Sequence, residues 1–330
     1  MKKLIVFTLL IFTFVTKVFE INKVEIENNK LNVNGIEYFI KGICYDPVPL
    51  GKTKRNFDEI DKDLLLMQEA GINTIRVYSP VDDLNILDKI DKAGIKVITS
   101  FGYNQNGYYD ILNGTYVDYI NKFKDHNAIL LWELGNEYNY HPEWFNMNIE
   151  NWYLAMNNAA KKIKQIDKNH PVSTAHGEIP NKKAREMGSN IDIWGINVYR
   201  WDNPTSLIEE WEKVSDFPLY FSETGSDSYM TEDNHGFKKG INEDAQAMAN
   251  HNIISNAFKM KDKLTGIVIF QFVDGLWKAG NPEKQDIGGW APNSTGVPYD
   301  GSPNEEFWGI VDINRNKKKT FGVIKEFFHN

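Results

Sequence analysis

Two glutamates stand at the ends of apolar runs in this sequence. Glu137 follows Asn136 after the run AILLWELG, and Glu223 ends the run PLYFSE. Two carboxyl groups that face each other across a cleft can cleave a glycosidic bond, because one protonates the leaving oxygen while the other attacks carbon or activates water. A single carboxylate at the end of a strand is often only a cap for the next helix. The hypothesis therefore depends on a fold that brings both strand ends together.

Short apolar runs alternate with segments of helical periodicity from residue 39 onward. The predicted strands are residues 39–45, 73–78, 96–102, 128–135, 171–176, 192–199, 218–223 and 266–272. The predicted helices lie near residues 57–70, 82–93, 115–125, 149–168, 180–188, 204–214, 242–262 and 317–328. The strands are apolar on both faces, as parallel strands covered by helices are. Eight such units in about 300 residues, without a G-x-G-x-x-G turn after the first strand, predict an α/β fold of the (β/α)8 TIM-barrel type rather than a doubly wound sheet.

Active sites of such barrels lie at the carboxyl ends of the strands. The fourth and seventh predicted strands lead into Glu137 and Glu223, so the two carboxyl groups are expected at the same mouth. The loops after the seventh and eighth strands, residues 224–241 and 273–316, are long, and long loops in a compact domain are usually functional. The second loop holds Trp277 and other aromatic residues, which either stack on sugar rings or pack the loop onto the barrel.

The N-terminus carries the pattern of an export signal. Lys2 and Lys3 precede an apolar stretch over residues 4–15 that is too short to span a bilayer comfortably. Residues 1–20 are therefore expected to be a signal peptide, or an N-terminal anchor if they are not cleaved. The protein is expected to be secreted, extracellular or periplasmic, with residues 21–330 as one catalytic domain.

Residues 21–37 alternate apolar and polar types around Asn28 and Asn29, which predicts a short β-hairpin ahead of the barrel. The sole cysteine, Cys44, allows no intrachain disulfide. The sequence contains no H-E-x-x-H, G-x-x-x-x-G-K-[ST] or G-x-S-x-G motif. No metal and no cofactor are therefore expected.

Charge excludes two classes of partner. The formal net charge is −8, and the only short basic run, residues 317–319, is expected to be a solvated helix start. Binding to nucleic acid or to an anionic membrane surface needs a basic stripe, which is absent. We therefore expect a neutral polysaccharide or oligosaccharide as the partner, no nucleic acid, no membrane insertion of the mature domain, and a monomer.

A family resemblance rests on several motifs. GNE at residues 135–137, ET at 223–224 and INTIRVY at 72–78 are similar to the retaining glycoside hydrolases of clan GH-A, the 4/7 superfamily. The stretches FIKGICYDPVP, LLLMQEAGINTIRVYSP and LWELGNEYNY resemble the barrel domains of families 2 and 5 and the family 72 β-1,3-glucanosyltransferases. FWGIVDINRNKKKT resembles the end of family 2 barrels. The resemblance covers essentially all of the chain after its N-terminal segment.

The resemblance implies a role for each matched residue. It makes Glu137 the general acid/base and Glu223 the nucleophile. The substrate-binding residues that it implies are Asn136 at the sugar 2-hydroxyl, Arg76 and Tyr199 as partners that orient the nucleophile, and Trp277 as the floor of the −1 subsite.

The residue types agree with these roles. Glu223 must be ionised to attack, and the positive charge of Arg76 and a hydrogen bond from Tyr199 favour that form. Glu137 must start protonated, which a dry, aromatic setting favours. The structural alternatives are a salt bridge that fills the barrel for Arg76 and a satisfied buried hydroxyl for Tyr199. Carboxyl groups about 5 to 5.5 Å apart are expected, because that separation accompanies retention.

His176 ends the fifth predicted strand in the stretch TAHGE. A histidine at a strand end can bind a sugar hydroxyl, although a lone histidine is often a satisfied structural residue. It is a further candidate for substrate binding.

Several functions stay open at this point. The leading prediction is a secreted retaining β-glycoside hydrolase that cleaves a polysaccharide, and the resemblance alone favours β-1,3-glucan. The alternatives are a β-1,3-glucanosyltransferase with the same catalytic residues, a β-1,4-glucanase or mannanase, and a non-catalytic carbohydrate-binding barrel. The last of these typically lacks one of the two carboxylates, whereas both are present here.

Overall fold

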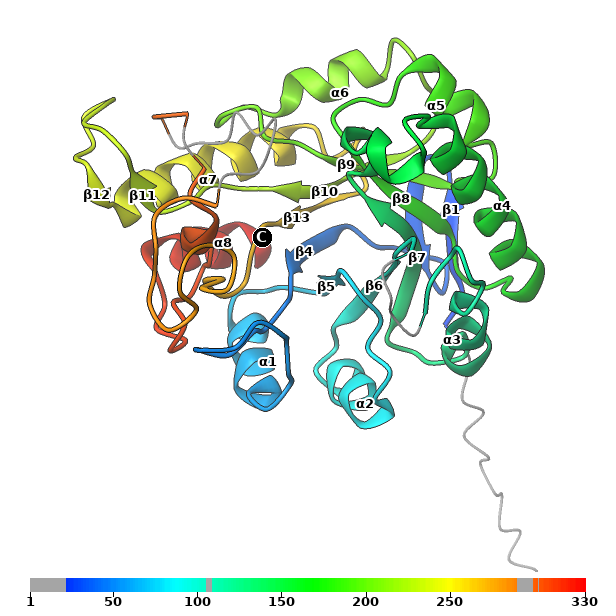
Figure 1. Ribbon diagram of the computed structural model, residues 1–330, viewed down its shortest axis with the longest axis horizontal. Coiled ribbons are helices and arrows are strands. Elements are labelled where there is room, and N and C mark those ends of the chain that lie inside the picture. Colours follow the sequence, from blue (N-terminus) through cyan, green and yellow to red (C-terminus); the bar gives the residue numbers. More distant parts are fainter. Residues whose placement is uncertain (1–21, 105–108, 290–298, 302) are drawn as a thin grey trace, which may run out of the picture.

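A closed barrel of parallel strands forms the centre of the protein (Figure 1). The computed structural model describes residues 22–104, 109–289, 299–301 and 303–330. Each strand predicted from the sequence is present, and the neighbour order around the barrel is β4-β5-β6-β7-β8-β9-β10-β13, closing on β4. The strands are β4 (Ile40–Cys44), β5 (Thr74–Val77), β6 (Lys96–Phe101), β7 (Ile129–Asn136), β8 (Val172–Gly177), β9 (Ile193–Asn197), β10 (Leu219–Thr224) and β13 (Gly266–Ile269). The predicted (β/α)8 TIM barrel is confirmed.

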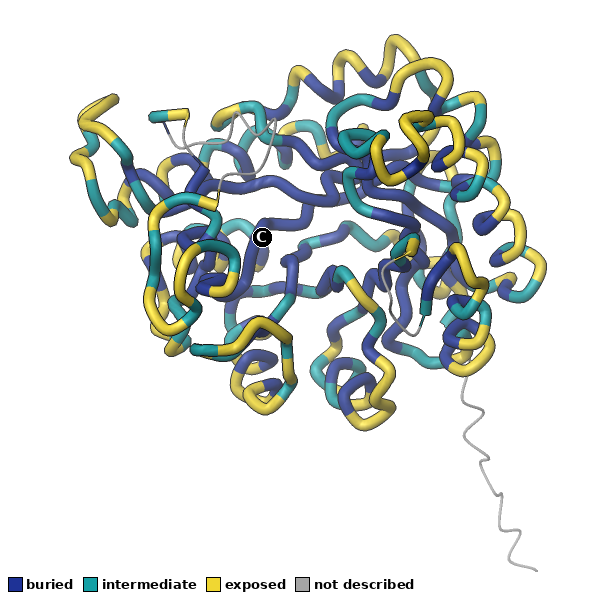
Figure 2. The backbone as a smooth tube through the Cα atoms, viewed as in Figure 1, coloured by how far each residue is buried: buried dark blue, intermediate teal, exposed yellow. Residues whose placement is uncertain are grey.

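A helix follows each barrel strand and covers the outside of the barrel. The helices are α1 (Ile60–Glu69), α2 (Leu84–Lys92), α3 (Tyr116–Phe123), α4 (Glu150–Ile166), α5 (Lys182–Met187), α6 (Thr205–Trp211), α7 (Glu243–Lys259) and α8 (Lys319–Phe328). In α2, the Asp83 side chain accepts from the Asn85 amide at the start, and the apolar stripe Ile86, Leu87 and Ile90 is buried. Figure 2 shows the result, with buried strands inside and helices exposed on their outer faces.

The predicted hairpin closes one end of the barrel and gains a third strand. β1 (Val24–Glu27), β2 (Lys30–Val33) and β3 (Ile36–Glu37) form an antiparallel sheet, and Asn28 and Asn29 turn the chain with φ of 51° and 60°. Val24 and Leu31 pack in one apolar cluster with residues at the start of the barrel strands. The Val24 amide also donates to the carbonyl of Asn169, just before β8. The sheet therefore covers the amino-terminal end of the barrel.

The N-terminal segment predicted to direct export, residues 1–20, lies outside the described residues. Within the described part of the chain, no helix has the length and apolar character needed to cross a membrane.

A buried ion pair occupies the middle of the barrel. Arg76 on β5 and Glu133 on β7 are both fully buried, and Arg76 Nε donates to the two Glu133 oxygens at 2.9 and 3.0 Å. The Tyr220 hydroxyl donates to Glu133 at 2.6 Å, and Ser100 also hydrogen-bonds to this carboxylate. A buried carboxylate needs such a full set of donors, because desolvating it is costly. Glu133 therefore holds Arg76 in the middle of the barrel. The Nη1 and Nη2 atoms of Arg76 remain available to donate to residues at the mouth of the barrel.

The loops after β10 and β13 pack over the start of α8. Lys318 is 7% exposed, and its Nζ lies 2.6 Å from Asp274 Oδ1 and 3.1 Å from the Ser228 hydroxyl. The expectation of a fully solvated basic run was therefore wrong for Lys318, because the long loops bury it as the counter-charge of Asp274. The loop after β10 also contains a small ribbon, β11 (Tyr229–Met230) with β12 (Gly240–Ile241).

Candidate active site

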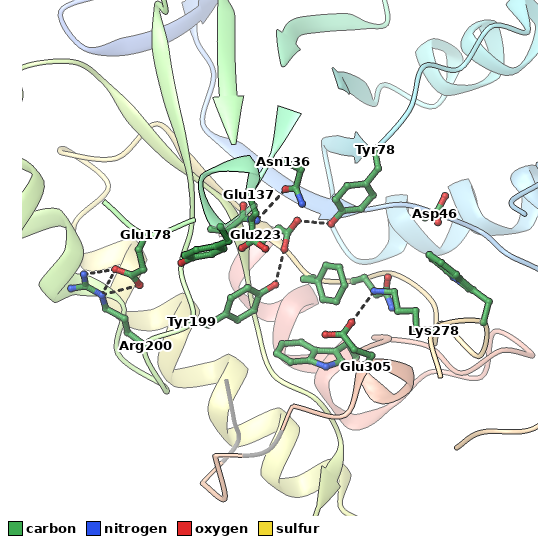
Figure 3. A pocket seen from close by; sticks show the side chains of 16 residues that line it. Asp46, Tyr78, Asn136, Glu137, Glu178, Tyr199, Arg200, Glu223, Lys278 and Glu305 are labelled. Atoms are coloured by element: carbon green, nitrogen blue, oxygen red, sulfur yellow. Dashed lines mark hydrogen bonds and ion pairs between the residues drawn. The ribbon is translucent and has the colours of Figure 1, made fainter. Parts of the chain in front are cut away.

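A cavity of about 500 Å³ opens at the carboxyl ends of the barrel strands (Figure 3). The residues predicted for the site that line it are Asn136, Glu137, Tyr199, Glu223 and Trp277. Arg76 is not part of the lining, but it donates a hydrogen bond to Glu223, which is. His176 is not part of the lining either. The two glutamates singled out from strand ends thus share one cavity, as the barrel topology requires.

Glu223, at the end of β10, is surrounded by hydrogen-bond donors. Arg76 Nη1 donates to Oε1 at 2.7 Å, the Tyr78 hydroxyl donates to the same oxygen at 2.7 Å, and the Tyr199 hydroxyl donates to Oε2 at 2.9 Å. Burial, followed by the nearby negative charges, raises the pKa of both tyrosines well above its usual value, so they stay protonated donors. Donors and a cation around a carboxylate stabilise its charged form.

Tyr78 was missed by the sequence prediction, although a signal for it exists. It follows Arg76 by two positions at the end of β5, and side chains two apart on a strand point to the same side. With Arg76 inside the barrel, the Tyr78 side chain is expected on the same inner side and nearer the mouth.

Glu137 has the opposite environment. It follows β7 in the left-handed region with φ 55°, which non-glycine residues adopt rarely and which is often found at functional sites. Burial, and next the negative charge of Glu223, raise its pKa to about 7, while a hydrogen bond from Asn197 and the charge of Arg76 oppose the shift. Near neutral pH a large fraction of Glu137 therefore carries a proton that it can donate.

Asn136 is fixed by two donors to its side-chain oxygen. Arg76 Nη2 donates to Oδ1 at 2.8 Å and Asn197 Nδ2 donates at 3.1 Å. Asn197 is oriented in turn, because its own oxygen accepts from the Ser222 hydroxyl at 2.7 Å. Since both contacts use the oxygen of Asn136, its amide nitrogen is the atom that can donate to a hydroxyl in the cavity. Asn197, which also lines the cavity, was not predicted.

The loop after β13 supplies an aromatic and charged wall. Trp277 is 37% exposed in the cavity lining, as expected for a surface on which a ring can stack. Next to it, Lys278 Nζ lies 4.0 Å from the centre of the Phe270 ring and 3.2 Å from Glu305 Oε2. The side chains of Lys278 and Glu305 are each 15% exposed. This ion pair was not predicted, because its members lie in an irregular loop far apart in sequence.

His176 lies outside the cavity. It is 7% exposed, its Nδ1 lies 2.9 Å from the carbonyl oxygens of Gly177 and Glu178, and its ring packs against Tyr153 of α4. Burial lowers its pKa to about 4, so the ring is neutral. Direct contact with a sugar is not supported by this placement, and the structural alternative accounts for it better.

No metal site was found in the part of the chain that the structure describes: it contains no group of three or more His, Cys, Asp or Glu side chains placed to hold an ion.

Replacing Arg76 should destabilise the protein strongly. Arg76→Met leaves Glu133 and Glu223 buried without their cation, and removing one partner of a buried ion pair typically costs about 3–5 kcal/mol. Urea unfolding of the variant and the wild type measures this loss. Arg185→Met is a matched control, because the Arg185 guanidinium donates to the carbonyl of Pro180 and pairs with no carboxylate among the described residues. A loss below about 1 kcal/mol in Arg76→Met, similar to an ordinary surface change, contradicts this account.

Known proteins resemble this chain over most of its length. The 1,3-beta-glucanosyltransferase GAS4 of Saccharomyces cerevisiae is 26% identical over 239 residues, which cover 60% of this chain and 50% of that protein. A beta-galactosidase of Lactococcus lactis subsp. lactis is 24% identical over 336 residues, which cover 94% of this chain and 29% of that protein. The chain thus spans half or less of the length of these relatives.

Solved structures share the fold. The GH2 beta-galacturonidase of Eisenbergiella tayi bound to galacturonate superposes with a TM-score of 0.69 at 19% identity, covering 93% of this chain and 54% of that chain. The beta-D-glucuronidase of Dictyoglomus thermophilum gives a TM-score of 0.67 at 18% identity, covering 94% and 54%. At these identities the likeness shows the fold alone. The family itself is shown by the model for "Glycosyl hydrolases family 2, TIM barrel domain", which matches residues 24–286, so the chain belongs to this family of glycosidase barrel domains.

Proposed function

We propose that residues 21–330 form the catalytic domain of a retaining β-glycoside hydrolase that cleaves a polysaccharide with Glu223 as nucleophile and Glu137 as acid/base. The observation that carries the proposal is the contrast between two carboxyl groups in one cavity. Glu223 accepts hydrogen bonds from three donors, whereas burial and the Glu223 charge raise the pKa of Glu137 to about 7. A carboxylate held in place by three donors suits a nucleophile, and a buried carboxyl group with a raised pKa suits an acid.

The proposed reaction uses Glu223 and Glu137 in two steps. In the first step a Glu223 oxygen bonds to the anomeric carbon while Glu137 gives its proton to the leaving oxygen, which breaks the glycosidic bond. In the second step ionised Glu137 takes a proton from water, the water oxygen bonds to the anomeric carbon, and the ester to Glu223 breaks. A carboxyl separation of about 5 to 5.5 Å stays a prediction of this mechanism.

The neighbouring residues have supporting roles in the proposal. Arg76, Tyr78 and Tyr199 hold the Glu223 carboxylate through its two oxygens. Asn136 offers its amide to a sugar hydroxyl next to the reacting carbon, and Trp277 offers a ring face to the apolar side of the sugar. His176 takes no part.

A neutral sugar fits the cavity better than a uronic acid. Of the described residues that line the cavity, the acidic ones are Asp46, Glu137, Glu178, Glu223 and Glu305, and the basic ones are Arg200 and Lys278. Both basic side chains are already paired, Lys278 with Glu305 at 3.2 Å and Arg200 with Glu178 at 2.5 Å. A carboxylate on the substrate would lose its hydration without gaining an unpaired cation. This favours a neutral glycan, although proteins of similar fold are named for glucuronide and galacturonide chemistry.

Glu305→Gln should relax the choice between neutral and acidic sugars. Removing the carboxylate frees Lys278 to meet a substrate carboxylate, so the ratio of kcat/KM for 4-nitrophenyl β-glucuronide over 4-nitrophenyl β-glucoside is expected to rise about tenfold or more. The wild type should prefer the glucoside. Glu283→Gln is the control, because Glu283 is exposed in the same loop and does not line the cavity. A wild-type preference for the glucuronide, or an unchanged ratio in Glu305→Gln, contradicts the charge argument.

The proposed polysaccharide is β-1,3-glucan, which the relatives named 1,3-beta-glucanosyltransferases support. The test is a product profile from laminarin, cellulose oligomers, mannan and xylan, with Glu223→Gln beside the wild type and products resolved by size. Shorter oligomers from laminarin that are absent with Glu223→Gln are the expected result. Products from cellulose or mannan alone would move the specificity to β-1,4 linkages, and products longer than the starting oligomers would indicate glucanosyl transfer.

Export is part of the same proposal. The basic and apolar pattern of residues 2–15 suits a signal peptide or anchor, and a polysaccharide too large to cross a membrane suits an enzyme outside it. Mass spectrometry of the mature N-terminus from the producing cells tests this, with cleavage near residue 20 expected.

A further inference from the structure

Trp308 lies in the wall of the cavity next to Tyr199. The two rings meet edge to face, with ring centres 5.3 Å apart and planes at 83°. Trp308 also meets Phe270, with ring centres 5.5 Å apart and planes at 71°. Aromatic pairs have preferred geometries and stabilise each other beyond the area that they bury. Trp308 therefore supports the ring whose hydroxyl donates to Glu223 Oε2 at 2.9 Å (Figure 3).

The indole of Trp308 is not fixed by a hydrogen bond of its own. Within the described part of the chain, its buried Nε1 has no hydrogen-bond partner. The backbone beside it is held from several directions. The Phe307 carbonyl accepts from the Ser228 amide at 3.1 Å and from Lys318 Nζ at 3.2 Å. The Trp308 carbonyl accepts from the Gln271 amide at 3.1 Å. The place of the ring therefore depends on how the surrounding chain is held.

Gly309, the next residue, is also held from two sides. Its amide donates to Asp274 Oδ1 at 2.8 Å, and its carbonyl accepts from Gln246 Nε2 at 3.1 Å. A Cβ at Gly309 would lie 2.3 Å from the Asp274 amide nitrogen, so a larger residue does not fit. Lys318 Nζ lies 2.6 Å from the same Asp274 oxygen. Asp274, Lys318 and Gln246 form what we call the clamp on residues 307–309.

The clamp is buried and carries an ion pair. Asp274, Lys318 and Gln246 are all buried. Lys318 immediately precedes α8, and Gln246 belongs to α7, so two helices outside the barrel hold the wall of the cavity. Leaving either charge of a buried ion pair without its partner is costly. The pair therefore permits few alternative positions for the backbone that it contacts.

Resting on the proposed function, we propose that Trp308 is a positioning residue for the nucleophile. The clamp sets the place of the Trp308 ring, the ring supports Tyr199, and Tyr199 keeps its hydroxyl on Glu223 Oε2. Trp308 thus acts through Tyr199. A displaced Tyr199 would leave Oε2 without this donor, and a less firmly held carboxylate adopts the geometry of attack less often.

Trapping of a glycosyl enzyme separates attack from binding. 2,4-Dinitrophenyl 2-deoxy-2-fluoro-β-glucoside should form a bond from its anomeric carbon to Glu223 and release dinitrophenolate, with little need for an acid. The saturating rate of inactivation measures attack, and the half-saturating concentration measures binding. Trp308→Leu should lower the saturating rate about tenfold to a hundredfold, because small misplacements have effects of this size. The half-saturating concentration should stay within about twofold of the wild type.

The matched variants are Trp308→Phe and Trp211→Leu. Trp308→Phe keeps an aromatic ring beside Tyr199 and should trap within about threefold of the wild-type rate. Trp211, on α6, is also buried but does not line the cavity. Trp211→Leu should lose a similar free energy of unfolding, which urea unfolding measures, and should trap within about twofold of the wild-type rate. A loss of rate in both leucine variants would be a general effect of destabilisation and would contradict the proposal.

Lys318→Met tests the clamp without changing the ring, and it replaces Trp308→Leu if that variant does not fold. It should lower the saturating rate of trapping about threefold or more. Lys319→Met is the control, because Lys319 Nζ lies 2.7 Å from Asp244 Oδ2 and the Lys319 side chain is 58% exposed. Equal trapping rates in the two lysine variants would show that the clamp does not act on the nucleophile.

The outcomes separate the positioning role from the proposed function. If Trp308→Leu traps at the wild-type rate, or changes only the half-saturating concentration, the positioning role is wrong while the nucleophile stands. If the wild type is not labelled, the proposed function fails, and crystal structures of Trp308→Leu and Trp211→Leu then decide the positioning role. A Tyr199 hydroxyl more than about 3.5 Å from Glu223 Oε2 in Trp308→Leu alone supports it, and an unmoved hydroxyl overturns it.

Discussion

Glu223→Gln is expected to hydrolyse β-glucosides at least about 10⁴-fold more slowly than the wild type while it remains folded. The amide cannot form the ester intermediate, and removing a nucleophile leaves only the rate enhancement from binding and electrostatics. The fold should survive, because Glu133 remains as the counter-charge of Arg76 when Glu223 is neutralised. The change therefore separates catalysis from stability better than a change at Arg76 does.

The measurement is kcat/KM for 4-nitrophenyl β-glucoside, with the far-ultraviolet circular dichroism spectrum as a check of folding. Glu209→Gln, an exposed glutamate on α6, is the control and should keep the wild-type rate within about twofold. Glu223→Ala with added azide gives an independent test, because the anion can attack from the vacated side and yield an α-glycosyl azide. More than about 1% residual activity in a folded Glu223→Gln protein, with no azide product from Glu223→Ala, would assign the nucleophile elsewhere.

The second large effect concerns Glu137 and pH. Its pKa of about 7 lies above the usual value for a glutamate, so the carboxyl group is protonated below that pH and loses its proton as pH rises. Since the first step needs the proton, wild-type kcat/KM should fall above about pH 7 and approach a tenfold loss per pH unit. Glu137→Gln should lack this alkaline limb and be about 10²–10⁴-fold slower with a sugar leaving group.

The leaving group provides a control within the same experiment. A 2,4-dinitrophenyl glucoside needs little protonation, so Glu137→Gln should lose far less in its first step with this substrate than with a disaccharide. Profiles of kcat/KM from pH 4 to 9 for both substrates, with Glu209→Gln alongside, make the comparison. An alkaline limb that persists at the same pH in Glu137→Gln would belong to another group.

The barrel and the positions of its two glutamates could be predicted from the sequence for a physical reason. Parallel strands buried on both faces produce apolar runs that stand out from amphipathic helices, and chemistry at their carboxyl ends limits the search to a few positions. Asn136, Glu137 and Glu223 occupy such positions. Arg76 lies within β5, two residues before Tyr78 and therefore below the mouth.

Other parts of the site depend on information that periodicity does not carry. Lys278 and Glu305 meet across an irregular loop, and Lys318 is buried only because two long loops fold over it. The prediction for His176 used its position at the end of a strand but not the face of the strand on which its side chain lies. Ser173 of β8 contacts Tyr220 inside the barrel, so His176, three positions later, points outward to α4. Glu133 lies within an apolar run, and the sequence does not show that it pairs with Arg76 across the barrel.

The antiparallel sheet β1-β2-β3 fixes the direction in which the enzyme can be tethered. Val24 enters the protein at the amino-terminal end of the barrel, beside Asn169, while the residues that line the cavity lie at the carboxyl ends of the strands. A linker, membrane anchor or solid support joined ahead of residue 22 therefore points the catalytic mouth away from the surface that holds it. Polymer chains approaching from solution then meet the mouth first, so immobilisation through the N-terminus should preserve turnover of large glucans better than attachment through the loop after β13.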